Sequence, residues 1–145
     1  MADKISRERR SANMRAIRSK GMKPELFVRR MVYSLGYRFR LHRKDLPGKP
    51  DLAFIGRKKA IFVNGCFWHQ HPGCREGRPP RTNQEYWAPK LRRNVERDRE
   101  NVEQLSEKGW KSLVIWECET KHEPSLAQRL ADFLGPPSIG EFHRR

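Results

Sequence analysis

The chain has 145 residues and a mass of 17.2 kDa, which is room for one domain of ordinary size around one hydrophobic core. It carries 32 Lys and Arg residues against 17 Asp and Glu, a formal net charge of +15. Such an excess points to a polyanionic partner, with nucleic acid as the leading class. A disordered basic tail is excluded, because 36% of the residues are hydrophobic and 10% are aromatic.

The sequence offers no pattern for secretion or membrane insertion. Residues 1–4 begin no apolar stretch of the secretory type, and no apolar run approaches the roughly 18 residues of a membrane span. The three cysteines are an odd number, which argues against a disulfide framework and for reduced thiols. We therefore expect a soluble, cytoplasmic protein in which the cysteines have another role.

The first part of the chain predicts a basic arm followed by a helix and a strand. Residues 1–23 are rich in Arg, Lys and Ser and poor in apolar residues. Pro24 suits the first position of a helix, Glu25 suits its positive end, and Gly36 suits its termination. Apolar residues recur between them at helical spacing, and the alternation over 37–42 then predicts a half-buried strand.

The rest of the pattern predicts an α/β fold with a central sheet and helices packed on it. In chain order we expect a hairpin of strands 52–55 and 60–63 after the turn at Pro47-Gly48, a loop over 66–87, a helix over about 89–108, a buried strand over 113–116, a short helix over 126–134 and a loose tail from 135.

The hairpin predicts the neighbours of Asp51. If Ile55 lies opposite Ala60, Asp51 lies opposite Asn64 and beside the main chain of Val63. A carboxylate next to a backbone carbonyl supplies the hard oxygen ligands that Mg²⁺ takes alongside phosphate oxygens. The alternative is that Asp51 only caps a turn and a strand.

A second group of residues has the composition of a zinc site. Cys66, His69, His71 and Cys74 lie within nine residues, and Cys118 follows at the end of a predicted strand. Three thiols and one imidazole form a tetrahedral Cys₃His site that would hold an otherwise unsupported loop against the sheet. Only one histidine is needed, so the other is available for chemistry. The alternative is three cysteines without a metal.

Asp98 lies in the middle of an apolar stripe on the helix predicted over about 89–108. At 100° per residue it falls between Leu91, Val95, Val102 and Leu105. A buried carboxylate needs a partner, which is either one of the many arginines or the spare histidine. A carboxylate that orients a histidine holds it as a general base.

Aromatic residues gather where the predicted loop offers little core. Phe67 and Trp68 lie within the cysteine loop, and Tyr86 and Trp87 lie close to Lys90 and to arginines. Aromatic side chains among basic residues suit stacking on or between bases. The alternative is that they form a satellite core at the edge of the sheet.

Together these residues resemble the very-short-patch-repair (Vsr) DNA mismatch endonucleases. The matching segments are Asn13-Met14-Arg15-Ala16-Ile17, Leu46-Pro47-Gly48-Lys49-Pro50-Asp51, Gly65-Cys66-Phe67-Trp68-His69, Asn94-Val95-Glu96-Arg97-Asp98, Gly109-Trp110 and Val114-Ile115-Trp116-Glu117-Cys118. They keep the order and spacing of the family over residues 10 to about 134.

The resemblance implies a restriction-endonuclease-like α/β fold with a structural zinc ion, and an enzyme that uses Mg²⁺ to nick DNA 5′ to the thymine of a T:G mismatch. Carried over by position, Asp51 and the carbonyl of Val63 would hold Mg²⁺, and Glu25 would support the waters on the metal. His69 would be the general base and Asp98 would orient it.

The resemblance also assigns the other groups. The zinc ligands would be Cys66, His71, Cys74 and Cys118. The aromatic wedge beside the mismatch would consist of Phe67, Trp68 and Trp87, and the DNA contacts would include Lys90 and, from the arm, Asn13 and Met14. The implied domains are an arm over 1–23, an endonuclease domain over 24–134 and a tail over 135–145.

Two positions depart from the family pattern. Val63-Asn64 stands where the family often has Thr-His; a main-chain ligand survives the first change, whereas the second replaces an imidazole with an amide that cannot act as an acid. An inserted residue before Cys74 lengthens the zinc-ligand spacing by one. The alternatives are therefore a related nicking enzyme without mismatch preference and a DNA-binding module that has lost catalysis.

The expected partner is double-stranded DNA with a mismatch, with mismatch-repair proteins of the MutL type as further partners. We expect a monomer that associates with the bacterial nucleoid when it is bound to DNA.

Overall fold

The structure is a computed structural model that describes residues 23–137. The chain divides into two compact units, one made of residues 39–119 and the other of the segments on either side. The predicted arm, with Asn13 and Met14, lies outside the described residues, as does the end of the predicted tail. None of the helices in the described part is both long and apolar enough to span a membrane.

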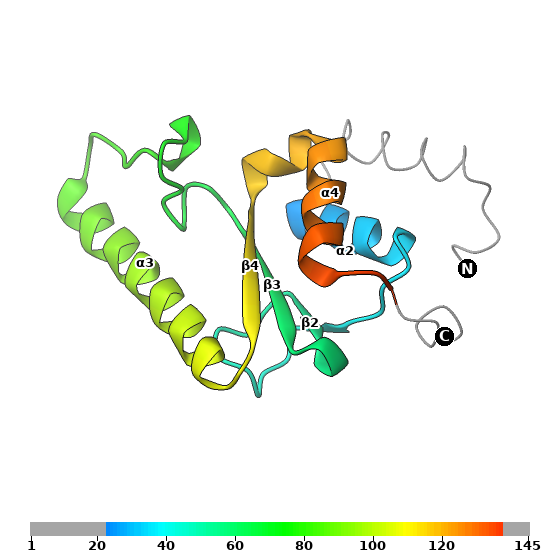
Figure 1. Cartoon of the computed structure of the whole chain (residues 1–145). Coiled ribbons are helices and arrows are strands. Elements are labelled where there is room, and N and C mark those ends of the chain that lie inside the picture. The colour runs from blue at the N-terminus through cyan, green and yellow to red at the C-terminus, as the bar shows by residue number, and fades with distance from the viewer. Residues whose placement is uncertain (1–22, 138–145) are drawn as a thin grey trace. The chain divides into compact units, whose positions relative to one another are not determined.

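The central unit contains a four-stranded mixed sheet with the strand order β1-β2-β3-β4 (Figure 1). The strands are β1 (Arg40–Leu41), β2 (Leu52–Phe54), β3 (Lys59–Asn64) and β4 (Lys111–Trp116). The first three are antiparallel neighbours, and β4 pairs parallel to β3. The predicted α/β class with a central mixed sheet is confirmed, while its restriction-endonuclease-like topology stays a prediction.

The hairpin register differs from the expected one. Leu52 pairs with Ile61 and Ala53 with Ala60, so Asp51 does not lie opposite Asn64 as predicted. The cause is at the turn, where Ile55 leaves the strand and begins a short 3₁₀ helix, Ile55–Arg57. A turn of that length moves the pairing by two residues, which keeps every side chain on its predicted face.

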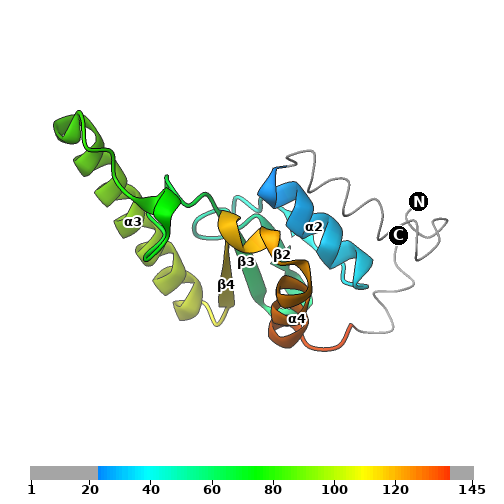
Figure 2. The same cartoon turned by 90° about the horizontal axis from the view of Figure 1, so that it is seen from above.

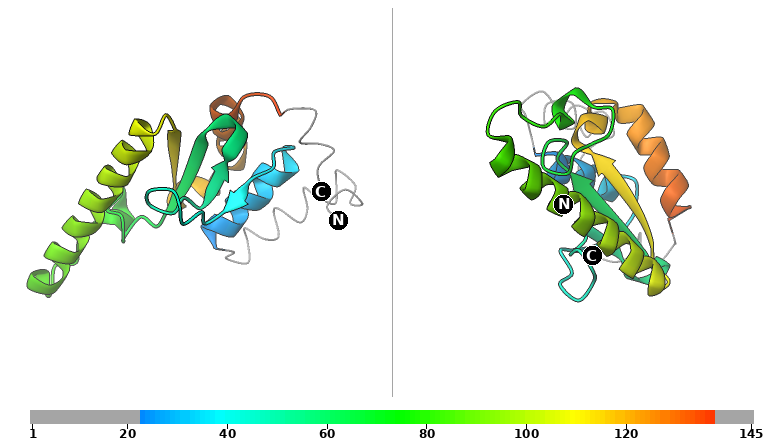
Figure 3. Two further views of the ribbon diagram at one scale, coloured as in Figure 1. Left: turned by 90° about the horizontal axis from the view of Figure 1, so that it is seen from below. Right: turned by 90° about the vertical axis from the view of Figure 1, so that its left-hand side faces the viewer.

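The long helix α3 (Gln84–Glu107) begins five residues before the predicted start. Pro89, where the helix was expected to begin, lies inside α3. Tyr86 and Trp87 are therefore on the helix and not in the loop, which ends at Asn83. The C-terminal part of α3 approaches β4, and its N-terminal half stands off the sheet beside the loop (Figures 1 and 3).

A small hydrophobic cluster holds α3 and the hairpin together. It consists of Leu46, Ala53, Ala60 and Leu105, with Phe62 and Trp110 packed against it. The turn at residues 46–49 is anchored in this cluster through Leu46, and the N–H of Lys49 donates to the carbonyl of Leu46 at 3.1 Å. Gly48 has a φ of +78° directly after Pro47, the pattern of a type II turn.

The flanking unit contains α2 (Pro24–Ser34) and α4 (Glu123–Leu134), which pack against each other (Figure 2). The predicted first helix is confirmed, with Pro24 at its start and Gly36 at a φ of +103° after its end. The strand predicted over 37–42 is shorter than expected, because only Arg40–Leu41 pairs with β2. The last helix begins three residues earlier than predicted, at Glu123.

Candidate active site and metal centre

A pocket of about 200 Å³ opens at the end of β3, next to α3. Its polar lining comes from the turn before β2, from β3 and its following loop, and from α3. These residues are Lys49, Asp51, Asn64, His69, Asp98 and Asn101. The predicted catalytic residues of the central unit are thus brought to one pocket from segments that span 50 residues of sequence.

Asp51 is held by the second strand of the hairpin, β3. Its Oδ2 accepts a hydrogen bond from the N–H of Val63 at 2.6 Å, and its Oδ1 lies 3.9 Å from Nδ1 of His42. The N–H and C=O of one strand residue point to the same edge of the strand, so the carbonyl of Val63 faces the side on which Asp51 lies. The predicted proximity of Asp51 to the main chain of Val63 is confirmed, although the register that led to it was wrong.

His69 and Asp98 form a short hydrogen bond in the pocket. Nδ1 of His69 lies 2.5 Å from Oδ2 of Asp98. A carboxylate at Nδ1 favours the tautomer with its proton there, which leaves Nε2 as a base. The partner of Asp98 is therefore the spare histidine and not an arginine, the question that helix spacing had left open.

Asp98 is less buried than the helical stripe predicted. Its side chain is 33% exposed, and Val95 one turn earlier is 42% exposed. Fewer residues of the apolar stripe are buried than predicted, because the N-terminal half of α3 stands off the sheet. Only Leu91 and Leu105 of α3 are buried. Asp98 therefore lies at the rim of a pocket that solvent reaches.

Asn64 is the buried polar residue of the pocket, with 8% of its surface exposed. Within residues 23–137 its side-chain amide makes no hydrogen bond, so a substrate can take the amide as a partner. Asn101 lies one turn after Asp98 on α3 and lines the same pocket. Sequence analysis did not identify Asn101 or Lys49, although the i, i+3 spacing from Asp98 was a signal for the first.

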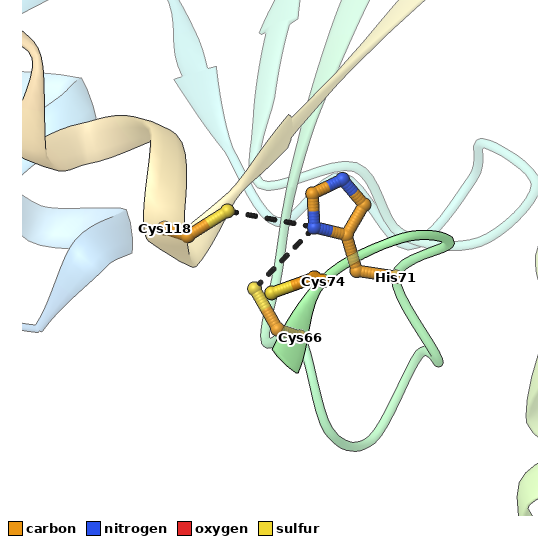
Figure 4. Close-up of side chains that lie close together, drawn as sticks. All are labelled: Cys66, His71, Cys74 and Cys118. Atoms are coloured by element: carbon orange, nitrogen blue, oxygen red, sulfur yellow. Dashed lines mark hydrogen bonds between the residues drawn. The ribbon is translucent and has the colours of Figure 1, made fainter. Parts of the chain in front are cut away.

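The four residues predicted as zinc ligands form one cluster. The Sγ atoms of Cys66, Cys74 and Cys118 and a ring nitrogen of His71 all lie within 4.8 Å of one another (Figure 4). Parallel pairing explains the contact between distant segments: Asn64 pairs with Trp116, so the residues two positions further along each strand emerge side by side.

The spacing of these atoms fits tetrahedral zinc. Bonds of about 2.3 Å to sulfur and about 2.0 Å to nitrogen separate the two ligand atoms by about 3.5 Å. Nδ1 of His71 lies 3.7 Å from Sγ of Cys66 and 3.4 Å from Sγ of Cys118 (Figure 4). Burial raises the pKa of the Cys66 thiol to about 12, and a cation bound by the cluster would oppose that effect.

Two residues outside the ligand set shape this cluster. The ring of His71 stacks on Trp116, with the ring centres 4.3 Å apart and the planes 12° apart. Gly77 is buried against the loop, and a Cβ at this position would lie 2.6 Å from the carbonyl oxygen of His71 and 3.2 Å from that of Cys66. Only glycine fits there. Sequence analysis missed both residues, because each acts through a packing contact that local spacing does not show.

The aromatic residues form a cluster above the loop and the start of α3. Phe67, Trp68 and Trp87 contact one another with ring centres 5.2 to 5.7 Å apart, and Tyr86 lies edge-on to Trp87 at 5.0 Å. Asn94 on α3 donates to the carbonyl of Trp68 at 3.1 Å, which ties the loop to the helix. Trp68 is 48% exposed and Tyr86 59%, so the cluster presents rings to solvent.

Two further predicted residues, Lys90 and Glu25, lie on helices. Lys90 is one turn after Tyr86 on α3, and its Nζ lies 3.2 Å from the hydroxyl of Tyr86 and 5.0 Å from the ring centre. Glu25 is in the first turn of α2, in the flanking unit, 3.7 Å from Arg29. Asn13 and Met14 fall outside the described residues.

Comparisons with known proteins bear on this site. The profile of the family described as DNA mismatch endonuclease Vsr matches residues 2–75. The relative "Type II nicking enzyme V.XorIIP" of Xanthomonas oryzae pv. oryzae is 47% identical over 136 residues, which cover 94% of this chain and 99% of the relative. "Type II nicking enzyme V.NaeI" of Lentzea aerocolonigenes is 50% identical over 115 residues, covering 76% of this chain and 68% of the relative. "DNA mismatch endonuclease Vsr" of Escherichia coli is 37% identical over 139 residues, covering 92% and 88%.

Proposed function

This chain belongs to the Vsr family of DNA mismatch endonucleases, and from that premise we propose that it is a Mg²⁺-dependent enzyme that nicks one strand of duplex DNA 5′ to the thymine of a T:G mismatch. The observation that carries the proposal is the contact of His69 with Asp98 in the pocket that also contains Asp51. A base and a metal-binding carboxylate in one open pocket are the groups that phosphodiester hydrolysis needs.

The metal would be held by Asp51 and the carbonyl of Val63. Both are hard oxygen ligands, and the hydrogen bond from the N–H of Val63 fixes one carboxylate oxygen. Magnesium bound by these two ligands would supply positive charge to the phosphate oxygens and would acidify a bound water. Glu25 is proposed to support the metal waters because its position matches the family pattern.

His69 would act as the general base. Asp98 holds Nδ1, so Nε2 could accept a proton from the attacking water as its oxygen adds to phosphorus. The P–O bond to the leaving backbone oxygen would then break, and that oxygen would take a proton from solvent water. The side-chain amide of Asn64 can donate a hydrogen bond to the phosphate, but it has no proton to give as an acid. His69 and Asp98 therefore carry the proton transfer at the nucleophile.

The mismatch would be recognised by the wedge of Phe67, Trp68 and Trp87. The ring of Trp68 is exposed, and it contacts the half-buried rings of Phe67 and Trp87, so the three could enter a base step as a preassembled unit. Unstacking a base step costs less free energy where base pairing is weakened. Lys90, in the second turn of α3, would contact the DNA near this wedge. Asn13 and Met14 are proposed to approach the duplex from its other groove, as the family pattern implies.

The cluster of Cys66, His71, Cys74 and Cys118 would bind one structural zinc ion. Its support is the tetrahedral spacing of the ligand atoms and the loop that they close. A fully occupied protein ligand set leaves no position for a substrate, which separates this metal from the one that acts in the pocket.

The names of the relatives favour a second candidate function. The Xanthomonas and Lentzea proteins are both called type II nicking enzymes, so this chain could share nicking without the mismatch preference, as a companion of a restriction and modification system. A third candidate, a DNA-binding module without catalysis, has only Asn64 in its favour. Restored nicking on Asn64→His in a chain that otherwise never nicks would identify Asn64 as the cause.

The deciding experiment measures nicking of T:G and matched duplexes of varied flanking sequence, with Mg²⁺ and with EDTA. We expect Mg²⁺-dependent cleavage of one strand at T:G only. Equal cleavage of matched duplexes supports the second candidate, and binding without cleavage in Mg²⁺ or Mn²⁺ supports the third.

Copurification would test a MutL-type partner, and sedimentation would test the expected monomer.

A further inference from the structure

Lys49 has an unusual backbone conformation at the edge of the pocket. Its φ is +48°, in the left-handed region of backbone space that residues other than Gly, Asn and Asp rarely adopt. It also precedes Pro50, and a following proline restricts the backbone of the residue before it. Strained residues of this kind persist only where the surrounding structure imposes them, and they gather at functional sites.

The neighbouring residues impose the conformation. The type II turn holds the N–H of Lys49 on the carbonyl of Leu46, and both Leu46 and Pro50 are buried. Gly48 packs closely on α3, because a Cβ there would lie 2.9 Å from side-chain atoms of Asn101. Lys49 is therefore fixed between two anchored residues, at a point where the chain turns toward Asp51.

Lys49 is exposed and is one of the residues that line the pocket, together with Asp51, His69 and Asp98. Within residues 23–137 its ammonium group makes no hydrogen bond or ion pair. A cation without a protein partner at the edge of a pocket that contains two carboxylates is available to an anionic ligand. A phosphodiester approaching Asp51 and Asp98 needs such a cation to offset repulsion.

We propose that Lys49 is a substrate-contacting residue whose ammonium group binds a non-bridging oxygen of the phosphate to be cleaved, an inference that rests on the proposed nuclease function. The strained turn keeps the Cα of Lys49 beside the pocket, so that the backbone of Lys49 loses less conformational entropy when the phosphate binds. No proton is transferred: Lys49 contributes charge, while His69 remains the base.

Lys58 offers a matched control. It is also a lysine in the left-handed region, with a φ of +54°, and it is exposed. It precedes β3, whereas the pocket lies at the other end of that six-residue strand, about 20 Å away. Replacing either lysine with Met removes one charge from the same kind of backbone position.

The first test measures binding in EDTA, so that no cleavage occurs. Affinity for a T:G duplex is determined by fluorescence anisotropy between roughly 50 and 300 mM salt. In this range phosphate contacts dominate the salt dependence of DNA affinity. Lys49→Met should reduce the slope of log affinity against log salt by about 1, one phosphate contact, and Lys58→Met should leave it unchanged. Equal slopes for the two variants would overturn the proposed contact.

The second test measures single-turnover nicking in Mg²⁺. Lys49→Met should slow nicking by about 10²-fold, whereas Lys49→Arg keeps the charge and should stay within about tenfold of wild type. Lys58→Met should nick as wild type. A wild-type protein that never nicks would overturn the nuclease function, while the salt slopes would still decide the contact of Lys49 with phosphate.

A third variant separates substrate contact from backbone structure. Lys49→Gly removes the side chain and suits the left-handed conformation, so its melting temperature should equal or exceed that of wild type. Its nicking rate should fall as in Lys49→Met. Wild-type nicking by a well-folded Lys49→Gly protein would show that Lys49 serves only the turn, and would overturn the proposal.

Discussion

The Cys/His cluster and the acidic pocket both lie beyond the carboxyl end of β3, yet they are built in opposite ways. In the cluster, four ligand atoms face one another and the loop closes around them. In the pocket, Asp98 orients His69, while Lys49 and Asn64 have side chains without a protein partner in the part of the chain that the structure describes. A closed ligand set suits a structural metal and an open one suits a reaction, so we expect the cluster to determine stability and the pocket to determine rate.

Removing a cluster ligand should have the largest effect. Zinc binding to a structural site contributes about 10–16 kcal/mol of folding free energy, more than a small domain has in reserve. Cys118→Ser should therefore give poorly folded protein, and wild type should contain about one zinc per chain by metal analysis. Well-folded wild-type protein without zinc would contradict a structural role for the cluster.

Asp51→Asn should abolish nicking without affecting the fold. The amide keeps the shape of the side chain but loses the charge that holds Mg²⁺, so the rate should fall by about 10³-fold or more. Affinity for DNA should hold or rise, because one source of phosphate repulsion is removed. Single-turnover kinetics and anisotropy on the same protein measure both; parallel losses of binding and rate would mean that Asp51 is structural.

The two histidines should give opposite phenotypes. His69→Ala should lose about 10²- to 10⁴-fold in nicking rate through loss of the base, while keeping its zinc and its fold. His71→Ala should lose zinc and stability together. Metal content, circular dichroism and nicking, measured on the two variants side by side, distinguish the roles, and loss of zinc from His69→Ala would show that they are exchanged.

Gly77→Ala tests the packing of the cluster without touching a ligand. The added Cβ would meet the carbonyl of His71 at 2.6 Å, so the loop must shift, at a cost of about 1–3 kcal/mol in unfolding free energy. Thermal unfolding of zinc-loaded protein should show a lower midpoint. Gly56→Ala is the control, because nothing lies within 4 Å of a Cβ at that position; equal midpoints for the two variants would contradict the tight fit.

Trp68→Ala should have the smallest and most selective effect. The exposed ring contributes stacking and no charge, so its loss should reduce the preference for T:G over matched duplex by about 10-fold to 100-fold. The salt dependence of binding should hardly change. Competition binding with the two duplexes measures this, and an unaltered preference would assign Trp68 to packing alone.

The sequence predicted those features that depend on neighbouring residues. Pro24 and Gly36 mark the ends of α2 because proline and glycine act on their own backbone. The position of Asp98 on the inner face of α3 followed from helical spacing. The start of α3 did not, because it depends on a contact between segments: the ring of Trp87, which precedes Pro89, packs on Phe67 and Trp68.

From its residues alone, the sequence determined that two groups could exist in one chain, since the chemistry belongs to the side chains. One is a cluster of three thiols and an imidazole, and the other is a pair of a carboxylate and the spare imidazole. Only the tertiary structure decided which histidine joins which group. The parallel register of β3 and β4 brings Cys66 to Cys118 and turns His71 toward both, while α3 carries Asp98 to His69. A register set by a helical crossover depends on packing between distant segments, which local periodicity does not encode.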